Sequence, residues 1–338
     1  MNAEIFTEWV RRQGRHVIRT ESSYWYDAGP RVFQAFPFSW LIEPSEQELS
    51  KLMMKHGIVS LRYSLPLEAK EGMISYHVVL HAPYELEMLA HQARNGVRRG
   101  LKSFRVENIS FQRLAEDGWV LQLDTLERQG RTDSMSQAEW RAICLAAEGL
   151  PGFEAWGALS SEGELAATLL TVLVDDTYNV PYAQCHRKFL REHVNNALFY
   201  TVSKELLGRA GVAGIFFSLH SLDAPDSVNE FKFRMGLQAK AVRQRVVFHP
   251  LLRPLVSRSS HKLLASLLKR YPGNYLLSKA EGMVRFNLQG RLSLAEQEWP
   301  ECLAEAKARW FEGQGIELPQ AKPLAVGQEQ AVELKVES

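Results

Sequence analysis

Three short apolar segments separated by turn residues occupy residues 153–185. Residues 165–174 are rich in β-branched residues and Leu, and the turn from Ser160 to Gly163 separates them from residues 153–159. Asp175 and Asp176 then separate the second segment from residues 177–185. Short runs of this composition between turn signals are typical of strands. We therefore predict three strands, the first two of which form a hairpin.

The periodicity changes after residue 193. Apolar or small residues recur at spacings of three and four, as they do on one face of a helix, at Val194, Ala197, Leu198, Thr201, Val202 and Leu206. Gly208 and Gly211 follow, and glycine commonly ends a helix. Residues 212–219 are almost entirely apolar, which is typical of a strand buried on both faces of a sheet. A short helix ending near Gly236 and a strand over residues 238–249 complete this half.

The first half of the chain predicts a similar alternation. We expect helices over residues 4–14, 45–56 and 84–102, and strands over 58–65, 73–80 and 104–111. Ser45 at an N-cap and Glu48 three residues later predict a capping box. Residues 117–150 predict two helices around a polar loop at 129–136. Gly149, Pro151 and Gly152 then interrupt the pattern and predict a domain boundary.

Beyond residue 256 the pattern predicts an amphipathic helix over residues 257–269 and another helix over 288–309. From Gly313 onward the chain loses aromatic residues and gains Gln, Glu, Pro and Lys, a composition typical of disorder. The predicted organisation is therefore a first half (1–150), a second half (151–256), a helical extension (257–312) and a disordered tail (313–338).

Composition excludes several classes of protein. With 40 Lys and Arg against 39 Asp and Glu, no net charge selects for nucleic acid or an acidic partner. Cys144, Cys185 and Cys302 are too widely spaced for a metal-ligand or disulfide pattern, which predicts no metal and a reducing compartment. No stretch has signal-peptide character or approaches the ~20 apolar residues that span a bilayer. We expect a soluble, cytoplasmic protein.

The sequence EFKFRMG occupies residues 230–236, on the predicted short helix after the buried strand. In that position it resembles the Phe-Lys-x-x-x-Gly run of FemAB-like proteins, which are peptidoglycan-bridge aminoacyltransferases and acyl-CoA-using relatives within the GNAT superfamily. The basic helix with Arg94, Arg98 and Arg99 is similar to one in their N-terminal half. The resemblance implies an α/β (α+β) fold of two GNAT-like halves, the first degenerate, with mixed twisted sheets and flanking helices.

The resemblance also implies a place for the acyl donor. GNAT enzymes bind the donor pyrophosphate at a strand-to-helix turn, and a helix N-terminus suits an anion. The corresponding donor-binding candidates here are Gln184, His186, Arg187, Lys188, Asn195 and Asn196. The usual glycine-rich loop is missing, since no glycine stands between Gly163 and Gly208. Positive charge from the turn is the alternative means of holding the donor.

Lys232 stands where the matching lysine of FemAB-like proteins faces the reacting centre, so the resemblance implies a catalytic role in stabilising an oxyanion. The alternative is a surface charge. Phe231 and Phe233 flank Lys232, and we expect at least one of them to face the core. Cys185 and His186 are neighbours on a strand and point to opposite faces, so they do not form a catalytic pair.

Arg94, Arg98 and Arg99 are candidate substrate-binding residues. Guanidinium groups bind phosphate bidentately and keep their charge. A solvated helix face is the alternative.

Two functions remain open. The first is transfer of an acyl or aminoacyl group from acyl-CoA or aminoacyl-tRNA to an amine acceptor by direct attack, with no permanently bound cofactor. The second is a catalytically silent GNAT-like protein that binds a ligand or partner. The EFKFRMG run and the basic turn favour the first function, and the missing glycines favour the second.

Overall fold

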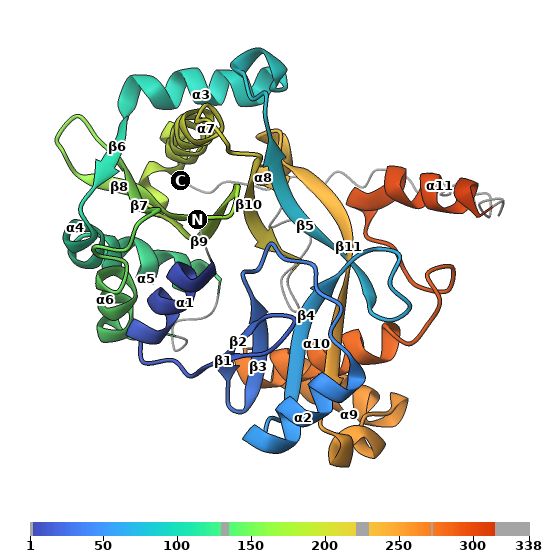
Figure 1. The fold of residues 1–338 in the computed structure, drawn as a ribbon. Coiled ribbons are helices and arrows are strands. Elements are labelled where there is room, and N and C mark those ends of the chain that lie inside the picture. The colour runs from blue at the N-terminus through green and yellow to red at the C-terminus, as the bar shows by residue number, and fades with distance from the viewer. Residues whose placement is uncertain (1–2, 130–134, 221–229, 272, 315–338) are drawn as a thin grey trace.

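The computed structural model describes residues 3–129, 135–220, 230–271 and 273–314. In these residues, helices surround one large sheet (Figure 1). The tail predicted over residues 313–338 lies outside the described residues, except for Gly313 and Gln314. Within the described ranges, no helix combines the length and the apolar character needed to cross a bilayer.

The strands are β1 (Val17–Arg19), β2 (Tyr24–Gly29), β3 (Val32–Phe36), β4 (Ser60–Leu65), β5 (Met73–His81), β6 (Arg105–Ile109), β7 (Phe153–Leu159), β8 (Leu165–Val174), β9 (Thr177–Cys185), β10 (Gly214–Leu219) and β11 (Gln238–Phe248). The α-helices are α1 (Ala3–Arg12), α2 (Glu46–His56), α3 (His91–Ser103), α4 (Phe111–Glu116), α5 (Gly118–Arg128), α6 (Gln137–Leu145), α7 (Val194–Leu207), α8 (Glu230–Arg234), α9 (Arg258–Arg270), α10 (Tyr275–Gln289) and α11 (Ala304–Gly313). Short 3₁₀ helices are η1 (Leu86–Met88), η3 (Arg187–Glu192), η5 (Pro250–Leu255) and η6 (Glu301–Leu303).

The strand order is β1-β2-β3-β4-β11-β5-β10-β9-β8-β7-β6. Neighbouring strands are antiparallel except for β3 with β4 and β9 with β10, which are parallel. Strand β11 lies between β4 and β5, and β6 pairs with β7. Strands from before and after residue 150 therefore interleave in one sheet, and the domain boundary near residue 150 stays a prediction.

The unit β3-α2-β4 has the same geometry as the unit β9-α7-β10. In each unit a helix connects two parallel strands that share three residue pairs, which are Val32–Gln34 with Ser60–Arg62 and Thr177–Asn179 with Gly214–Phe216. Beyond these pairs, each strand pairs only with its antiparallel neighbour. The repeated geometry supports two GNAT-like halves, and the predicted mixed α/β fold is confirmed.

Strand β8 shows why the sheet is covered on both faces. Nine of its ten residues are buried, as its near-continuous apolar sequence predicts. Leu169 packs into the cluster that includes residues of α3 and α7, whereas Leu170 and Val172 pack into the cluster with α1 and α6. Successive side chains of a strand point to opposite faces, so these two clusters lie on opposite sides of the sheet.

The helix predicted over residues 84–102 begins later than expected. Helix α3 starts at His91, and residues 86–88 form η1. The spacing of Leu86 and Leu89 fits a 3₁₀ turn as well as an α-helix, because a 3₁₀ turn has three residues per turn. Tyr84, before the turn, donates its hydroxyl proton to the carbonyl oxygen of Met235 at 2.9 Å. This segment therefore contacts the end of α8 and does not extend α3.

The helix predicted over residues 288–309 is wrong, and α10 is absent from the prediction. Helix α10 ends at Gln289 and α11 starts at Ala304. A Cβ atom at Gly290 would stand 2.9 Å from the backbone of Gly72 and Met73, so the chain turns tightly against the start of β5.

The capping box predicted at α2 forms only in part. The Ser45 side chain accepts a hydrogen bond from the backbone N–H of Glu48 at 3.1 Å. The Glu48 carboxylate accepts hydrogen bonds from the backbone and the hydroxyl of Ser22, at 3.1 and 2.7 Å. This carboxylate therefore serves a tertiary contact to the segment before β2.

Candidate functional site

Lys232 lies on α8 and is partly buried. Its Nζ donates a hydrogen bond to Ser218 Oγ on β10 at 2.8 Å. Burial lowers the pKa of Lys232 from its ordinary value to about 8. Burial therefore distinguishes this side chain from a solvated surface charge, and it loses its proton near pH 8.

Helix α8 is short, and side chains on both sides of Lys232 hold it in place. The Phe231 ring packs edge-on against Phe199 of α7, with 5.3 Å between ring centroids. Phe233 lies 6.2 Å from the ring of Tyr76 on β5. Both phenylalanines pack against the main core, as predicted for at least one of them.

Strands β9 and β10 separate beside Lys232. Their last residue pair is Asn179 with Phe216, after which β9 pairs with β8 and β10 pairs with β5. Ser218 stands two residues beyond this last pair, on the part of β10 that has left β9. The Lys232 ammonium thus contacts the part of β10 that no longer pairs with β9.

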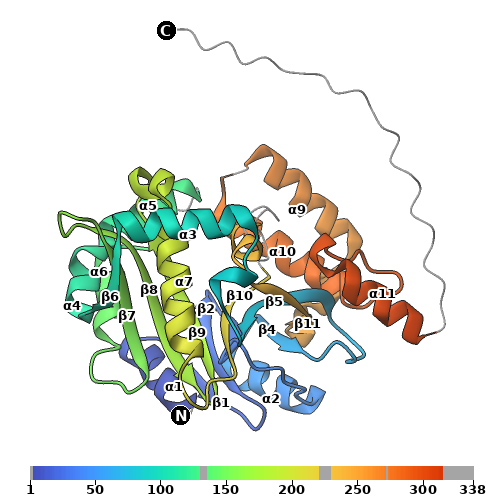
Figure 2. The same cartoon turned by 90° about the horizontal axis from the view of Figure 1, so that it is seen from above.

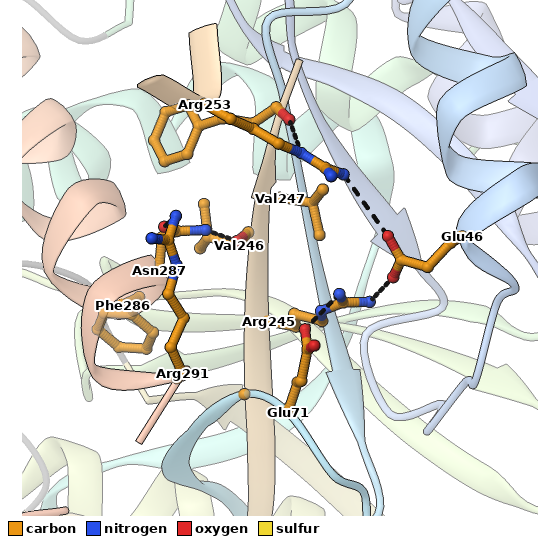
Figure 3. Close-up of a pocket in the computed structure, with 12 residues that line it drawn as sticks. Glu46, Glu71, Arg245, Val246, Val247, Arg253, Phe286, Asn287 and Arg291 are labelled. Carbon is orange, nitrogen blue, oxygen red and sulfur yellow. Dashed lines mark hydrogen bonds and ion pairs between the residues drawn. The ribbon is translucent and has the colours of Figure 1, made fainter. Parts of the chain in front are cut away.

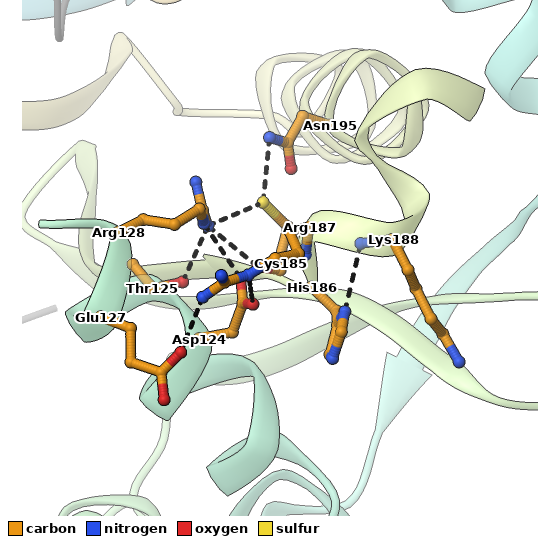
Figure 4. Close-up of polar contacts among 9 residues, drawn as sticks. All are labelled: Asp124, Thr125, Glu127, Arg128, Cys185, His186, Arg187, Lys188 and Asn195. Atoms are coloured by element: carbon orange, nitrogen blue, oxygen red, sulfur yellow. Dashed lines mark hydrogen bonds and ion pairs between the residues drawn. The ribbon is translucent and has the colours of Figure 1, made fainter. Parts of the chain in front are cut away.

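The predicted donor turn between β9 and α7 is tied to α5 through Arg187 (Figure 4). The Arg187 guanidinium donates to the Asp124 carboxylate and to Glu127 Oε2, the latter at 2.7 Å, and its backbone N–H donates to Asp124 at 3.1 Å. Burial alone would raise the pKa of Asp124, but hydrogen bonds from Arg187 and Arg128 hold this pKa below its usual range. Two carboxylates therefore hold the Arg187 side chain.

The neighbouring candidates also make contacts within the protein. The Lys188 ammonium pairs with Glu164, and its backbone N–H donates to His186 Nδ1 at 3.2 Å. Gln184 is buried and accepts from the Thr168 hydroxyl at 2.8 Å. A donor bound at this turn would have to compete with these contacts.

The two asparagines connect the first turn of α7 to its surroundings. Asn195 donates to Cys185 Sγ and Asn196 donates to Met235 Sδ, each at 3.2 Å. Burial raises the pKa of the Cys185 thiol, which keeps the sulfur protonated and a poor nucleophile. Asn196 places the donor turn next to α8, so the structure brings together these candidates and the helix of Lys232.

Helix α3 crosses closely over the start of α7 (Figure 2). A Cβ atom at Gly100 would lie 2.5 Å from the carbonyl oxygen of His193, so glycine permits this approach. Arg98 and Arg99 are exposed on α3. The Arg94 guanidinium donates a hydrogen bond to the carbonyl oxygen of Glu87 at 3.4 Å. Helix α3, which carries the three arginines, therefore packs against the start of α7, and the predicted donor turn leads into that same start.

Two residues at this site were not singled out from the sequence. Asp124 gives no signal, because a lone acid on an amphipathic helix is most often solvated. Ser218 gives a weak signal, since it is a polar residue in an otherwise apolar strand. Both assignments depend on contacts between elements that are far apart in the chain.

A cavity of about 510 Å³ lies elsewhere, at the edge of β11 (Figure 3). Strand β11 pairs with β5 only as far as Gln244, and α10 borders the edge beyond that residue. Within the cavity Arg245 pairs with Glu46 and Glu71, and Arg253 also pairs with Glu46. None of the predicted site residues lines it.

No protein-family profile matches the sequence, and no curated protein matches it. Among solved structures, FemX is similar at a TM-score of 0.49 and 11% identity, over 74% of this chain and 92% of that chain. The C-terminal domain of a protein assigned as a lysylphosphatidylglycerol synthetase from Agrobacterium fabrum is similar at a TM-score of 0.49 and 11% identity, over 71% of this chain and 86% of that chain. A tandem GNAT protein from the clavulanic acid biosynthesis pathway is similar at a TM-score of 0.38 and 12% identity, over 69% of this chain and 81% of that chain. These matches include FemX and a tandem GNAT protein, which are the kinds of protein that the sequence resembles.

Proposed function

We propose that the protein transfers an acyl or aminoacyl group to an amine, with Lys232 at the reacting centre. The observation that carries this proposal is the position of the lysine. Its Nζ lies 2.8 Å from Ser218 Oγ, beside the point where β9 and β10 separate. The GNAT-superfamily enzymes that the sequence resembles place a catalytic side chain on the corresponding helix.

The separation of β9 from β10 beyond Asn179 and Phe216 suits an extended donor. Parallel strands that separate leave backbone N–H and C=O groups on facing edges, and such groups need hydrogen-bond partners. An extended ligand with amide groups supplies those partners in the way that an added strand does. The amide-containing arm of acyl-CoA and the aminoacyl group of a charged tRNA both have this chemistry.

The chemistry needs little from the protein beyond position and charge. A neutral amine attacks the acyl carbonyl carbon, the C–N bond forms, and negative charge develops on the carbonyl oxygen. The Lys232 ammonium then stabilises that oxyanion, as an aimed donor in a partly dry site does. Collapse of the intermediate breaks the bond to the sulfur of coenzyme A or to the ribose oxygen of tRNA, and this leaving group takes up the proton that the new amide nitrogen loses.

The donor turn of the proposal consists of the first turn of α7 with His186, Arg187 and Lys188. Its charged side chains are paired with carboxylates, and it lacks glycine. A donor phosphate would therefore displace Asp124, Glu127 or Glu164, or would use the exposed Arg98 and Arg99 of α3. We assign those two arginines to substrate phosphate on this ground.

The test is a transfer assay on the full chain with acetyl-CoA, longer acyl-CoAs and charged tRNA as donors and a panel of amines. Transfer above the uncatalysed rate is expected, and Lys232→Ala should lower kcat by about 10²-fold or more. Lys240→Ala is the matched control, since Lys240 is exposed on the adjacent β11. Equal turnover in the Lys232 variant would remove the catalytic assignment.

The second candidate is a silent module that binds a ligand without turnover. The pairing of Arg187 and Lys188 with carboxylates favours it, because a prepared phosphate site would keep its cations available. Thermal-shift measurements distinguish the two candidates. A ligand that raises the melting temperature, with no transfer for any donor and acceptor, would establish the silent module.

A further inference from the structure

A strongly basic segment follows β11. Between His249 and Ala280 the sequence contains six Lys and Arg residues and no Asp or Glu, in a chain whose formal net charge is only +1. Four of the six, Arg258, Lys262, Lys269 and Arg270, are exposed on α9. Among the described residues these four make no ion pair. The positive charge of this segment is therefore local and available to a partner.

The same segment carries exposed apolar side chains. Of the twelve large hydrophobic residues that are exposed in the described part of the chain, seven lie between Leu251 and Leu276. On α9 itself, Leu263 is 62% exposed and Leu267, one turn later, is 38% exposed. Two exposed tyrosines, Tyr271 and Tyr275, stand at the junction of α9 and α10. A cluster of this kind marks an interaction surface.

Helix α9 lies at the outside of the molecule, with its other face on α10 (Figure 2). A cavity of about 280 Å³ lies between the two helices. Arg258, Lys262 and Arg285 line it together with the apolar side chains of Leu288 and Leu292. Arg285 also pairs with Glu281, so in the described part of the chain the cations that face the cavity without a carboxylate partner are Arg258 and Lys262. Cations beside an apolar lining match a group that is anionic at one end and hydrocarbon at the other.

We propose that η5, α9 and the start of α10 form a docking surface for an anionic phospholipid bilayer. An amphipathic surface rich in Lys and Arg, with exposed Leu and Tyr, binds at the interface between lipid headgroups and acyl chains. Tyrosine suits that interface because its ring is apolar and its hydroxyl is polar. Charge complementarity selects anionic lipids, and the surface needs no spanning helix.

The exposed leucines distinguish this partner from RNA. Single-stranded nucleic acid is held by cations together with aromatic rings on which bases stack. Aliphatic side chains such as Leu251, Leu255, Leu263 and Leu267 add nothing to base stacking, but they gain free energy on leaving water for hydrocarbon. The inference is independent of acyl transfer, since none of these residues belongs to the proposed reacting centre.

The experiment is co-sedimentation of the full chain with vesicles of phosphatidylcholine, alone or with about 30% phosphatidylglycerol. Binding to the anionic vesicles is expected, and it should weaken as salt rises. The double substitution Lys262→Gln and Lys269→Gln should lower the partition coefficient about 25-fold, since each charge near an anionic surface contributes about fivefold. Leu263→Ser with Leu267→Ser should lower it about tenfold or more, because both lose hydrocarbon contact.

The matched control is Lys51→Gln with Lys55→Gln, which removes two exposed lysines from α2. It should leave vesicle binding unchanged, and melting temperatures of all variants should show that they fold. No binding above that to pure phosphatidylcholine, or binding insensitive to the lysine and leucine changes, would overturn the proposal. So would tRNA binding that is tighter than vesicle binding and depends on the lysines but not on the leucines.

Discussion

Replacing Lys232 by Met should stabilise the protein at neutral pH. A lysine at the surface would leave stability within about 0.5 kcal/mol. Lys232 is partly buried, and burial lowers its pKa from 10.5 to about 8. At 1.36 kcal/mol for each tenfold change, this corresponds to a cost of roughly 3 kcal/mol at most for keeping the ammonium folded. Methionine has a similar length and carries no charge.

The sign of the pH dependence follows from the same pKa. Between about pH 8 and 10.5 the unfolded chain binds a proton at Lys232 that the folded chain has lost, so the stability of the natural protein rises with pH there. Below about pH 8 both states are protonated and the full cost applies. The advantage of Lys232→Met should therefore be constant below pH 8 and disappear towards pH 10.5.

Activity should fall over the pH range in which the stability of the natural protein rises. If the ammonium stabilises the oxyanion, kcat should fall as pH rises through about 8, where Lys232 loses its proton. Substrate KM should change little, because the contact strengthens in the transition state. A general base at this position would give the reverse profile, with kcat rising through the same pH.

Two measurements check the reasoning. Urea unfolding of the natural protein and of Lys232→Met at pH 6, 7, 8, 9 and 10 gives the stability difference, and a pH–rate profile gives the catalytic pKa. Lys240→Met on β11 is the control, and it should show no such pH-dependent difference. Equal stability of the two proteins at every pH would show that the lysine is solvated and would refute the argument from burial.

Three further predictions concern the elements around the site. Arg187→Ala should lower stability in urea more than Lys188→Ala does, because the buried Asp124 carboxylate then loses one of its two arginine partners, whereas Lys188 and Glu164 form an exposed pair. Equal losses would contradict this. Gly100→Ala should destabilise the protein by about 1–3 kcal/mol, because the new methyl group would meet the backbone carbonyl of His193 at the start of α7. Gly313→Ala is the control, and it should not lower the melting temperature, because nothing lies within contact distance of its new methyl group. Phe231→Ala should cost roughly 3 kcal/mol of unfolding free energy, and a cost below about 1 kcal/mol would show that the ring is not part of the core.

Local pattern is enough to predict most elements of the second half. The apolar runs that form β7, β8 and β9 appear within one residue of their predicted bounds, because strand periodicity and turn residues are local properties. The spacing of Val194 to Leu206 likewise predicts α7. The EFKFRMG run identifies the helix of Lys232 through its place after the buried strand. The prediction missed α10, although Asn274 caps its start locally, whereas the turn at Gly290 depends on contact with the segment before β5.

Only the tertiary structure decides which chemistry these residues can perform. The charge of Arg187 is visible in the sequence, but its partner Asp124 is 63 residues away and removes it from the set of free cations. The pKa of Lys232 depends on burial between α8 and β10, which no local pattern encodes. The interleaving of β11 between β4 and β5 is a matter of long-range pairing. Composition and spacing determine which elements form, whereas the environment of each side chain is set by packing between segments that are distant in the chain.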